Sequence, residues 1–170
     1  MKKQSGFTLI ELLVVVSIIS LLSSIVFSAV NNARSKGRDA KRQQDIHQIQ
    51  NALELYYAAN GQYPIFGWPM SNNPTTWGPF QTALSPYISS LPHDPIEDTD
   101  TSHMAYSGYQ LYGYYGAGYG CSGQWYMIVY TLENGSASYN PSVTTCDGTT
   151  FQYPGVGGNR TKTVGVGRGS

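Results

Sequence analysis

The sequence predicts an α+β protein in which a long N-terminal helix packs on a small antiparallel β-sheet head. Apolar residues gather at the start of the chain, and a helical repeat of apolar side chains follows them. The rest of the 170-residue chain is rich in turn and strand formers, with 19 Gly, 9 Pro and 14 Tyr in the whole sequence. Tyr favours strands, while Gly and Pro mark turns. This length holds one compact domain plus an appendage.

The charge balance bears on the class of partner. The chain carries ten basic and ten acidic residues, and only 12% of its residues are charged. A nucleic-acid-binding domain normally has a clear basic excess. We therefore expect no nucleic-acid partner.

The segment from Phe7 to Val30 is predominantly apolar and has a single charged side chain, Glu11. As a helix, it is long enough to cross a hydrocarbon core of roughly 30 Å. A secretory signal peptide has a shorter apolar stretch followed by a small-residue cleavage site. Here the short polar leader MKKQSG precedes the apolar run. Cleavage is therefore expected to leave a membrane-spanning helix on the mature chain.

Glu11 is the candidate functional residue of this helix. A charged group deep in a membrane costs at least ~2.5 kcal/mol and calls for a cationic partner. No Lys, Arg or His lies between Phe7 and Val30. A cut after Gly6 would free an amine on Phe7, and that amine on one subunit could neutralise Glu11 on the next. In the alternative interpretation, Glu11 reaches the headgroups and complements the helix dipole.

The leader and the start of the helix carry a recognisable pattern, in which Lys2 and Lys3 are followed by Gly6-Phe7-Thr8-Leu9-Ile10-Glu11-Leu12. This pattern resembles the class III signal of type IV prepilins and type II secretion pseudopilins. The resemblance implies that a prepilin peptidase cuts between Gly6 and Phe7 and methylates the new Phe7 amine. It also implies assembly into a filament with copies of itself and minor pilins, through an inner-membrane assembly platform.

Two features depart from the family pattern. Many members have a proline near the position of Ser28, where the helix kinks or melts, and this chain has none. The basic residues Arg34, Lys36, Arg38, Lys41 and Arg42 outnumber Lys2 and Lys3 yet would face outward, against the positive-inside rule. The prepilin signal and an exported C-terminal part favour the outward orientation. The basic cluster is interpreted as a solvated face, with binding to lipid headgroups or neighbouring subunits as the alternative.

Beyond the membrane the helix is expected to continue to about Asn60, because Ile46, Ile49 and Leu53 recur every three to four residues before the helix stop at Gly61. The predicted organisation is a leader at 1–6, a membrane or filament-core helix at 7–30, an amphipathic continuation at 31–60, a head at 61–153 and a Gly-rich flexible tail at 154–170. That tail is expected to be mobile or to become ordered against neighbouring subunits.

Within the head, prolines predict loops from Gly61 to His103, interrupted by a short helix or turn around Thr82 to Ser90. Strands are expected from Met104 and in GQWYMIVYTLE. Asn134-Gly135 is a hairpin signal that would pair the second strand with SASYN. The expected result is a sheet of three or four strands covered by the apolar stripe of the helix.

Cys121 and Cys146 predict a disulfide in an oxidising compartment, with two free buried thiols as the alternative. Their pairing would resemble the disulfide-bounded C-terminal loop of type IV pilins. The segment Leu91-Pro92-His93-Asp94-Pro95 is similar to the L-P-x-D-P segment of major pseudopilins, which carry calcium in this lobe. The resemblance makes Asp94, Glu97, Asp98 and Asp100 candidate calcium ligands, and a solvated acidic loop is the alternative. No other cofactor is expected.

Three functions are compatible with these features. The first is a pilin that polymerises through its N-terminal helix into a type IV pilus-like filament; the alternative is the major pseudopilin of a type II secretion system. The L-P-H-D-P segment favours the pseudopilin, whereas the cysteines and tyrosines favour the pilus. A membrane-tethered binding module is more distant, and no catalytic motif indicates an enzyme. The expected location is the cytoplasmic membrane for the precursor and a cell-surface filament after assembly.

Overall fold

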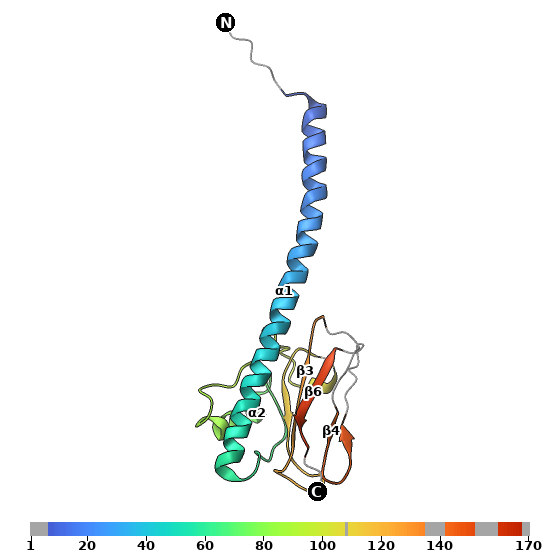
Figure 1. Cartoon of the computed structure of the whole chain (residues 1–170). Helices are drawn as coiled ribbons and strands as arrows, with labels where there is room; N and C mark the ends of the chain where they lie inside the picture. The colour runs from blue at the N-terminus through green and yellow to red at the C-terminus, as the bar shows by residue number, and fades with distance from the viewer. Residues whose placement is uncertain (1–6, 108, 135–141, 152–159, 168–170) are drawn as a thin grey trace. The chain divides into compact units, whose positions relative to one another are not determined.

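The computed structural model describes residues 7–107, 109–134, 142–151 and 160–167 (Figure 1). The chain forms two compact units, Met1–Gly37 and Arg38–Ser170. The helices are α1 (Leu9–Asn60), α2 (Pro74–Leu84) and the short 3-10 helix η1 (Ala105–Ser107). The strands are β1 (Gly67–Met70), β2 (Gly113–Tyr115), β3 (Tyr126–Thr131), β4 (Val143–Thr144), β5 (Thr150–Phe151) and β6 (Thr161–Val166).

The predicted long helix is confirmed as α1. It ends where expected, because Gly61 adopts a left-handed conformation with φ of 70°. The Gly61 N–H donates to the carbonyl of Tyr57 at 2.8 Å, which satisfies one carbonyl of the last turn. Ser28 lies within α1, so the helix continues through the position where many family members have a proline.

The larger of the two sheets of the second unit is antiparallel with the order β1-β2-β3-β6, and β3 and β6 lie side by side in it (Figure 1). The buried stripe Ile46, Ile49 and Leu53 of α1 belongs to the same core cluster as the sheet tyrosines Tyr114 and Tyr126. On the opposite face of β3, Met127 and Val129 pack into two separate apolar clusters. All six residues of β3 are therefore buried. The predicted α+β architecture, with the helix packed on a small antiparallel sheet, is confirmed.

The proline-rich segment has a turn at residues 85–87, within the range predicted for a helix or turn, but its helix lies earlier than predicted. It begins at Pro74 rather than near Thr82 and ends at Leu84, because Asn73 caps it by accepting from the Thr75 N–H at 3.1 Å. Proline is compatible with the first helical position, where its missing N–H has no intrahelical partner. The pair Asn73-Pro74 is a helix-start signal in the sequence. The prediction did not use it, because it treated the prolines of this segment as helix breakers. α2 buries Trp77 and Phe80 in the core.

Two strand predictions also need correction. The chain after Met104 forms η1, and the strand begins only at Gly113. Gly67–Met70 was expected to be a loop but forms β1, which tolerates Pro69 because it lies at the edge of the sheet. The predicted partner segment SASYN lies outside the described residues.

The prediction of a flexible tail is wrong for residues 161–166. These residues form β6, which pairs with β3 from Tyr126↔Val166 to Thr131↔Thr161. Thr161 and Thr163 are buried in that pairing. Gly165 permits a close approach of the two strands, since a Cβ there would lie 2.1 Å from the carbonyl oxygen of Tyr126. Gly165 therefore allows β6 to pack closely against β3, although the Gly-rich composition of the segment had indicated mobility.

We predict that Gly165→Ala lowers the free energy of unfolding by about 2 kcal/mol, because the added methyl forces β6 away from β3. Urea unfolding of the full chain in detergent, followed by tryptophan fluorescence, measures the change. Gly67→Ala is the matched control in the same sheet: its Cβ would meet only a Tyr115 ring atom at 3.8 Å. An equal loss in both variants would contradict the packing role of Gly165.

Candidate functional site

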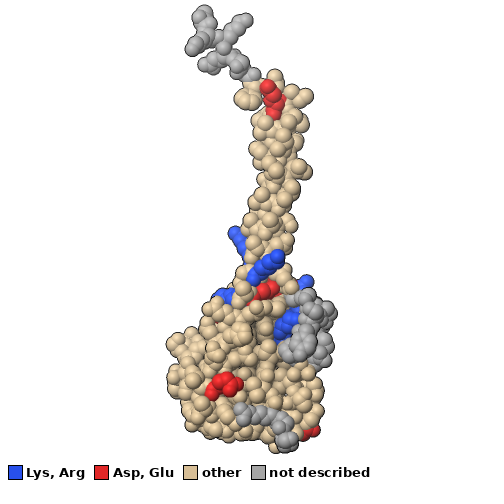
Figure 2. Space-filling view, viewed as in Figure 1, with Lys and Arg blue, Asp and Glu red and all other residues tan. Residues whose placement is uncertain are grey.

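The first candidate site is the apolar surface of the first unit. From Phe7 to Val30 the large apolar side chains are between 86% and 38% exposed. The most apolar window of α1 has a mean hydropathy of 2.6, which is sufficient for a membrane span by length and composition. In the space-filling view, acidic atoms lie near the start of this surface and most of the visible face beyond them carries neither acidic nor basic side chains (Figure 2). Such a surface requires lipid or other helices around it.

Glu11 closes the N-terminal turn of α1. The Thr8 backbone N–H and hydroxyl both donate to its Oε2, at 2.8 Å and 2.7 Å. The Glu11 N–H in turn donates to the Thr8 Oγ1 at 3.3 Å. This is a capping box, with Thr8 as the N-cap and Glu11 three residues later. The carboxylate thus lies where it complements the helix dipole, as the alternative interpretation expected. Thr8 carries no charge, so the predicted need for a cation remains.

The predicted processing site is only partly described. Phe7 is 86% exposed just before the first turn of α1. Gly6 and the rest of the leader lie outside the described residues. The described residues therefore do not test cleavage between Gly6 and Phe7 or methylation of Phe7, and both stay predictions.

The second candidate site is an ionic cluster around Arg42, in the second unit. The Arg42 side chain is fully buried and makes a bidentate pair with Asp94, with Nε–Oδ2 at 2.6 Å and Nη2–Oδ1 at 2.9 Å. Its Nη1 donates to Asp39 at 2.8 Å and to Glu133 at 2.6 Å. The cluster joins α1 to the loop before η1 and to the end of β3. A guanidinium can be buried when its donors are paired in this way.

Two further contacts complete this cluster. Arg38 forms a bidentate pair with Glu133. Asp39 accepts the backbone N–H groups of Glu133 and Asn134, each at 2.8 Å. The carboxylate of Asp39 therefore binds the chain directly after β3 as well as the guanidinium of Arg42.

The cluster shifts the proton affinities of its members. Burial alone would lower the pKa of Arg42, but its hydrogen bonds to Asp94 and Glu133 outweigh burial and raise that pKa. The hydrogen bond from Arg38 is the largest cause that lowers the pKa of Glu133, and with Arg42 it brings that pKa to about 2. Both side chains are consequently ionised at neutral pH.

The basic cluster from Arg34 to Arg42 is thus not a uniform solvated face. Lys41 pairs with Asp45 at 3.1 Å, and Arg38 and Arg42 pair as described above. Arg34 and Lys36 are exposed and have no carboxylate partner among the residues that the structure describes. The interpretation as a solvated face was wrong for the buried Arg42.

The four candidate calcium ligands do not converge. Asp94 is fully buried against Arg42, and Glu97 pairs with His93 at 2.8 Å. Asp98 pairs with His103 at 2.6 Å, and Asp100 accepts from the N–H and hydroxyl of Ser102. In the described part of the chain, no three His, Cys, Asp or Glu side chains form a group that could hold a metal. Assigning Asp94 as a ligand was wrong, because its carboxylate neutralises a buried cation; calcium binding itself stays a prediction.

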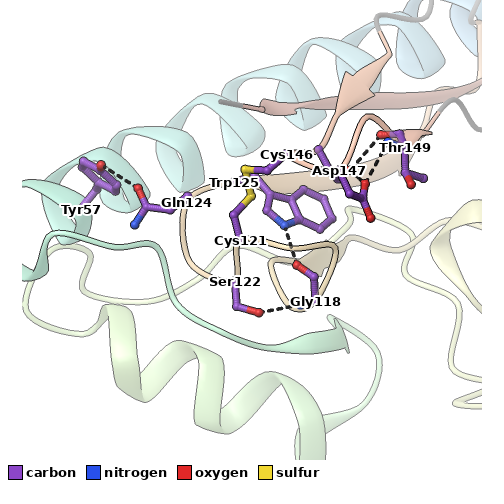
Figure 3. Close-up of a disulfide and its surroundings, with 10 residues drawn as sticks. Tyr57, Gly118, Cys121, Ser122, Gln124, Trp125, Cys146, Asp147 and Thr149 are labelled. Carbon is purple, nitrogen blue, oxygen red and sulfur yellow. Dashed lines mark hydrogen bonds between the residues drawn. A yellow bond between two sulfur atoms is a disulfide. The ribbon is translucent and has the colours of Figure 1, made fainter. Parts of the chain in front are cut away.

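Cys121 and Cys146 form a disulfide with a Cα–Cα distance of 5.9 Å (Figure 3). The bridge joins the turn before β3 to the turn between β4 and β5. The Trp125 ring packs beside it, and its indole N–H donates to the Gly118 carbonyl at 3.3 Å. A disulfide of this kind is typical of proteins exported to an oxidising compartment.

Sequence reasoning missed Arg42 and Asp39 as functional positions. A signal was available: counting back from Leu53 and Ile49 by three and four residues, the buried stripe of α1 continues through Asp45, Arg42 and Asp39. A charge in phase with an apolar stripe indicates a buried ion pair. The identity of its partners could not follow from this spacing.

Comparison with known proteins agrees with these features. Residues 1–27 match the family described as the prokaryotic N-terminal methylation motif. The chain is 36% identical over 98 residues to the type II secretion system core protein G of Vibrio cholerae, covering 56% of this chain and 67% of that protein. Its identity to the protein of the same name from Aeromonas hydrophila is 35% over 98 residues, covering 55% and 68%. No solved structure matches the chain.

The N-terminal motif, the apolar helix and the α+β head define a protein of the prepilin class, made as a membrane-anchored precursor. Within this class, the chain belongs to the family of type II secretion system core protein G.

We predict that Arg42→Met lowers the free energy of unfolding by about 3 to 5 kcal/mol, because it leaves the buried carboxylate of Asp94 without its cation. Lys36→Met, the control at an exposed position of α1 that is in no ion pair with the described residues, should cost less than about 1 kcal/mol. Adding Asp94→Leu to Arg42→Met should restore part of the loss. Denaturant unfolding measures all three, and equal effects of Arg42→Met and Lys36→Met would contradict the role of the cluster.

The Glu133 carboxylate also predicts a pH dependence. Since folding lowers its pKa from 4.5 to about 2, its contribution to stability is complete above pH 4.5 and is lost as the pH falls toward 2. The free energy of unfolding of the wild type should therefore decrease more steeply over this interval than that of Glu133→Gln. Parallel pH profiles of the two proteins would refute this assignment.

Proposed function

We propose that the chain is the major pseudopilin of a type II secretion system, a structural subunit rather than an enzyme. The observation that carries this proposal is the similarity to proteins named type II secretion system core protein G, at 36% identity over 98 residues with that of Vibrio cholerae. The matched length extends beyond the N-terminal motif. The relatives' names thus favour the pseudopilin, which was the alternative expectation, over the type IV pilus subunit that the sequence placed first.

The exposed apolar helix supports polymerisation as the activity. A prepilin peptidase would cut between Gly6 and Phe7 and methylate the Phe7 amine. An inner-membrane assembly platform would then bring subunits together so that their helices cover one another outside the cytoplasmic membrane, with minor pilins as further partners. Burial of this apolar surface supplies the favourable free energy once the helices leave the lipid.

Glu11 would set the register between subunits. Both hydrogen bonds from Thr8 reach Oε2, so Oε1 can accept from the Phe7 amine of a neighbouring subunit without loss of the helix cap. In an apolar filament core, such an ion pair is strong only when its two members lie together. Other registers would leave a carboxylate and an amine unpaired.

The second candidate function is a subunit of a true type IV pilus that extends from the cell surface. The disulfide between Cys121 and Cys146 favours it, because the bridge resembles the disulfide-bounded region of type IV pilins. In that case the filament would be long and visible at the cell surface.

Deletion of the gene tests the proposal in the organism that carries it. Loss of exported enzymes from the medium, with surface filaments retained, is expected for a pseudopilin; the opposite pattern would support the pilus. Complementation with the wild-type gene should restore secretion, and intact mass should identify a chain that starts at N-methylated Phe7. Met1 retained on assembled protein would overturn the proposal.

The Glu11→Gln variant tests the register within the same experiment. It keeps an oxygen that can accept the Thr8 hydrogen bonds but removes the charge, and we expect at least about a tenfold loss of secretion, as for a lost buried charge pair. Glu54→Gln is the matched control, since Glu54 lies on α1 in the second unit and accepts from the Tyr63 hydroxyl at 3.0 Å. Normal secretion by Glu11→Gln would exclude the ion pair.

A further inference from the structure

One face of the apolar helix is hollowed into a shallow groove. Its wall is apolar from Ile19 to Val30 apart from Ser23, and it ends at Asn31 and Arg34. Most of the groove wall is thus apolar, and its single cationic side chain, Arg34, lies at one end. This combination matches the two parts of a phospholipid, an acyl chain and a phosphate.

Arg34 is free to bind an anion. Of the five basic residues that follow the apolar segment, Arg38, Lys41 and Arg42 are in ion pairs with carboxylates. Arg34 and Lys36 are exposed and are in no ion pair with the described residues. Only Arg34 lines the groove, whereas Lys36 follows two residues later and therefore projects from a different side of the helix.

The depth of Arg34 fits a headgroup contact. Leu9 and Val30 are separated by about 32 Å along a helix, which spans a hydrocarbon core, and Arg34 follows about 6 Å farther on. The groove from Ile19 to Val30 is about 16 Å long, close to the thickness of one leaflet. An arginine at this level binds phosphate with two parallel hydrogen bonds.

A second copy of the chain offers poorer charge complementarity at Arg34. Its segment from Phe7 to Val30 carries only Glu11, near the opposite end of the helix. In the register that pairs Glu11 with a neighbouring Phe7, this carboxylate remains far from Arg34. We propose that the groove of the unassembled subunit binds one anionic glycerophospholipid, with an acyl chain along Ile19 to Val30 and its phosphate at Arg34. Assembly then requires this lipid to leave the groove.

Native mass spectrometry of the full-length chain in detergent tests the site, with phosphatidylglycerol or phosphatidylcholine of identical acyl chains added. The wild type should retain one phosphatidylglycerol per chain and little phosphatidylcholine. Arg34→Gln should reduce the retained phosphatidylglycerol about fivefold, the effect expected for one basic residue at an anionic surface. Lys36→Gln removes the same charge outside the groove and should change retention less than about twofold.

Three results would overturn the proposal. Equal retention of the two lipids by the wild type would show no headgroup recognition, and this comparison decides the matter even if a variant cannot be purified. Equal losses in Arg34→Gln and Lys36→Gln would indicate diffuse attraction to the surface. Dimers without lipid that disappear in Arg34→Gln would assign the groove to a second copy. None of these outcomes depends on whether the filament is a pilus or a pseudopilus.

Discussion

A buried guanidinium is tolerated only when its donors are paired, and Arg42 reaches that state only if three separate segments converge on it. Asp39 comes from the same helix, Asp94 from the proline-flanked loop and Glu133 from the end of β3. Removing any one of them leaves charge uncompensated in the interior, which costs several kcal/mol. The cluster thereby fixes which part of α1 faces the sheet. The aromatic core around Ile49 and Leu53 supplies the larger apolar burial but is less directional.

The sheet depends on the end of the chain as much as on its middle. β3 is buried on both faces and needs a partner on each side, and β6 provides the second one. The disulfide between Cys121 and Cys146 links the turn before β3 to the turn between β4 and β5. Together they stabilise a small head whose strands are short.

The first unit, unlike the second, has no buried apolar core among its described residues. Its apolar side chains remain exposed in the isolated chain, so its stability and its activity both depend on what surrounds it. In the membrane the surroundings are lipid, and in the proposed filament they would be other copies of the helix. Thr8 and Glu11 satisfy the first turn in both settings, while in the proposed lipid site Arg34 would lie at the level of the headgroups. Anchoring, release and assembly are thus alternatives for one surface.

Features that depend on local spacing could be predicted from the amino-acid sequence. The apolar run, the helix stop at Gly61, the α+β class and the prepilin motif all follow from neighbours along the chain or from its periodicity. Which distant groups meet depends on the folded chain: Asp94 is the partner of Arg42, and Gly165 is the point of close contact between β6 and β3. These could not be predicted because a carboxylate in a loop suits an ion pair, a metal or solvent equally well. A Gly-rich segment is likewise mobile or paired according to whether a free strand edge lies beside it.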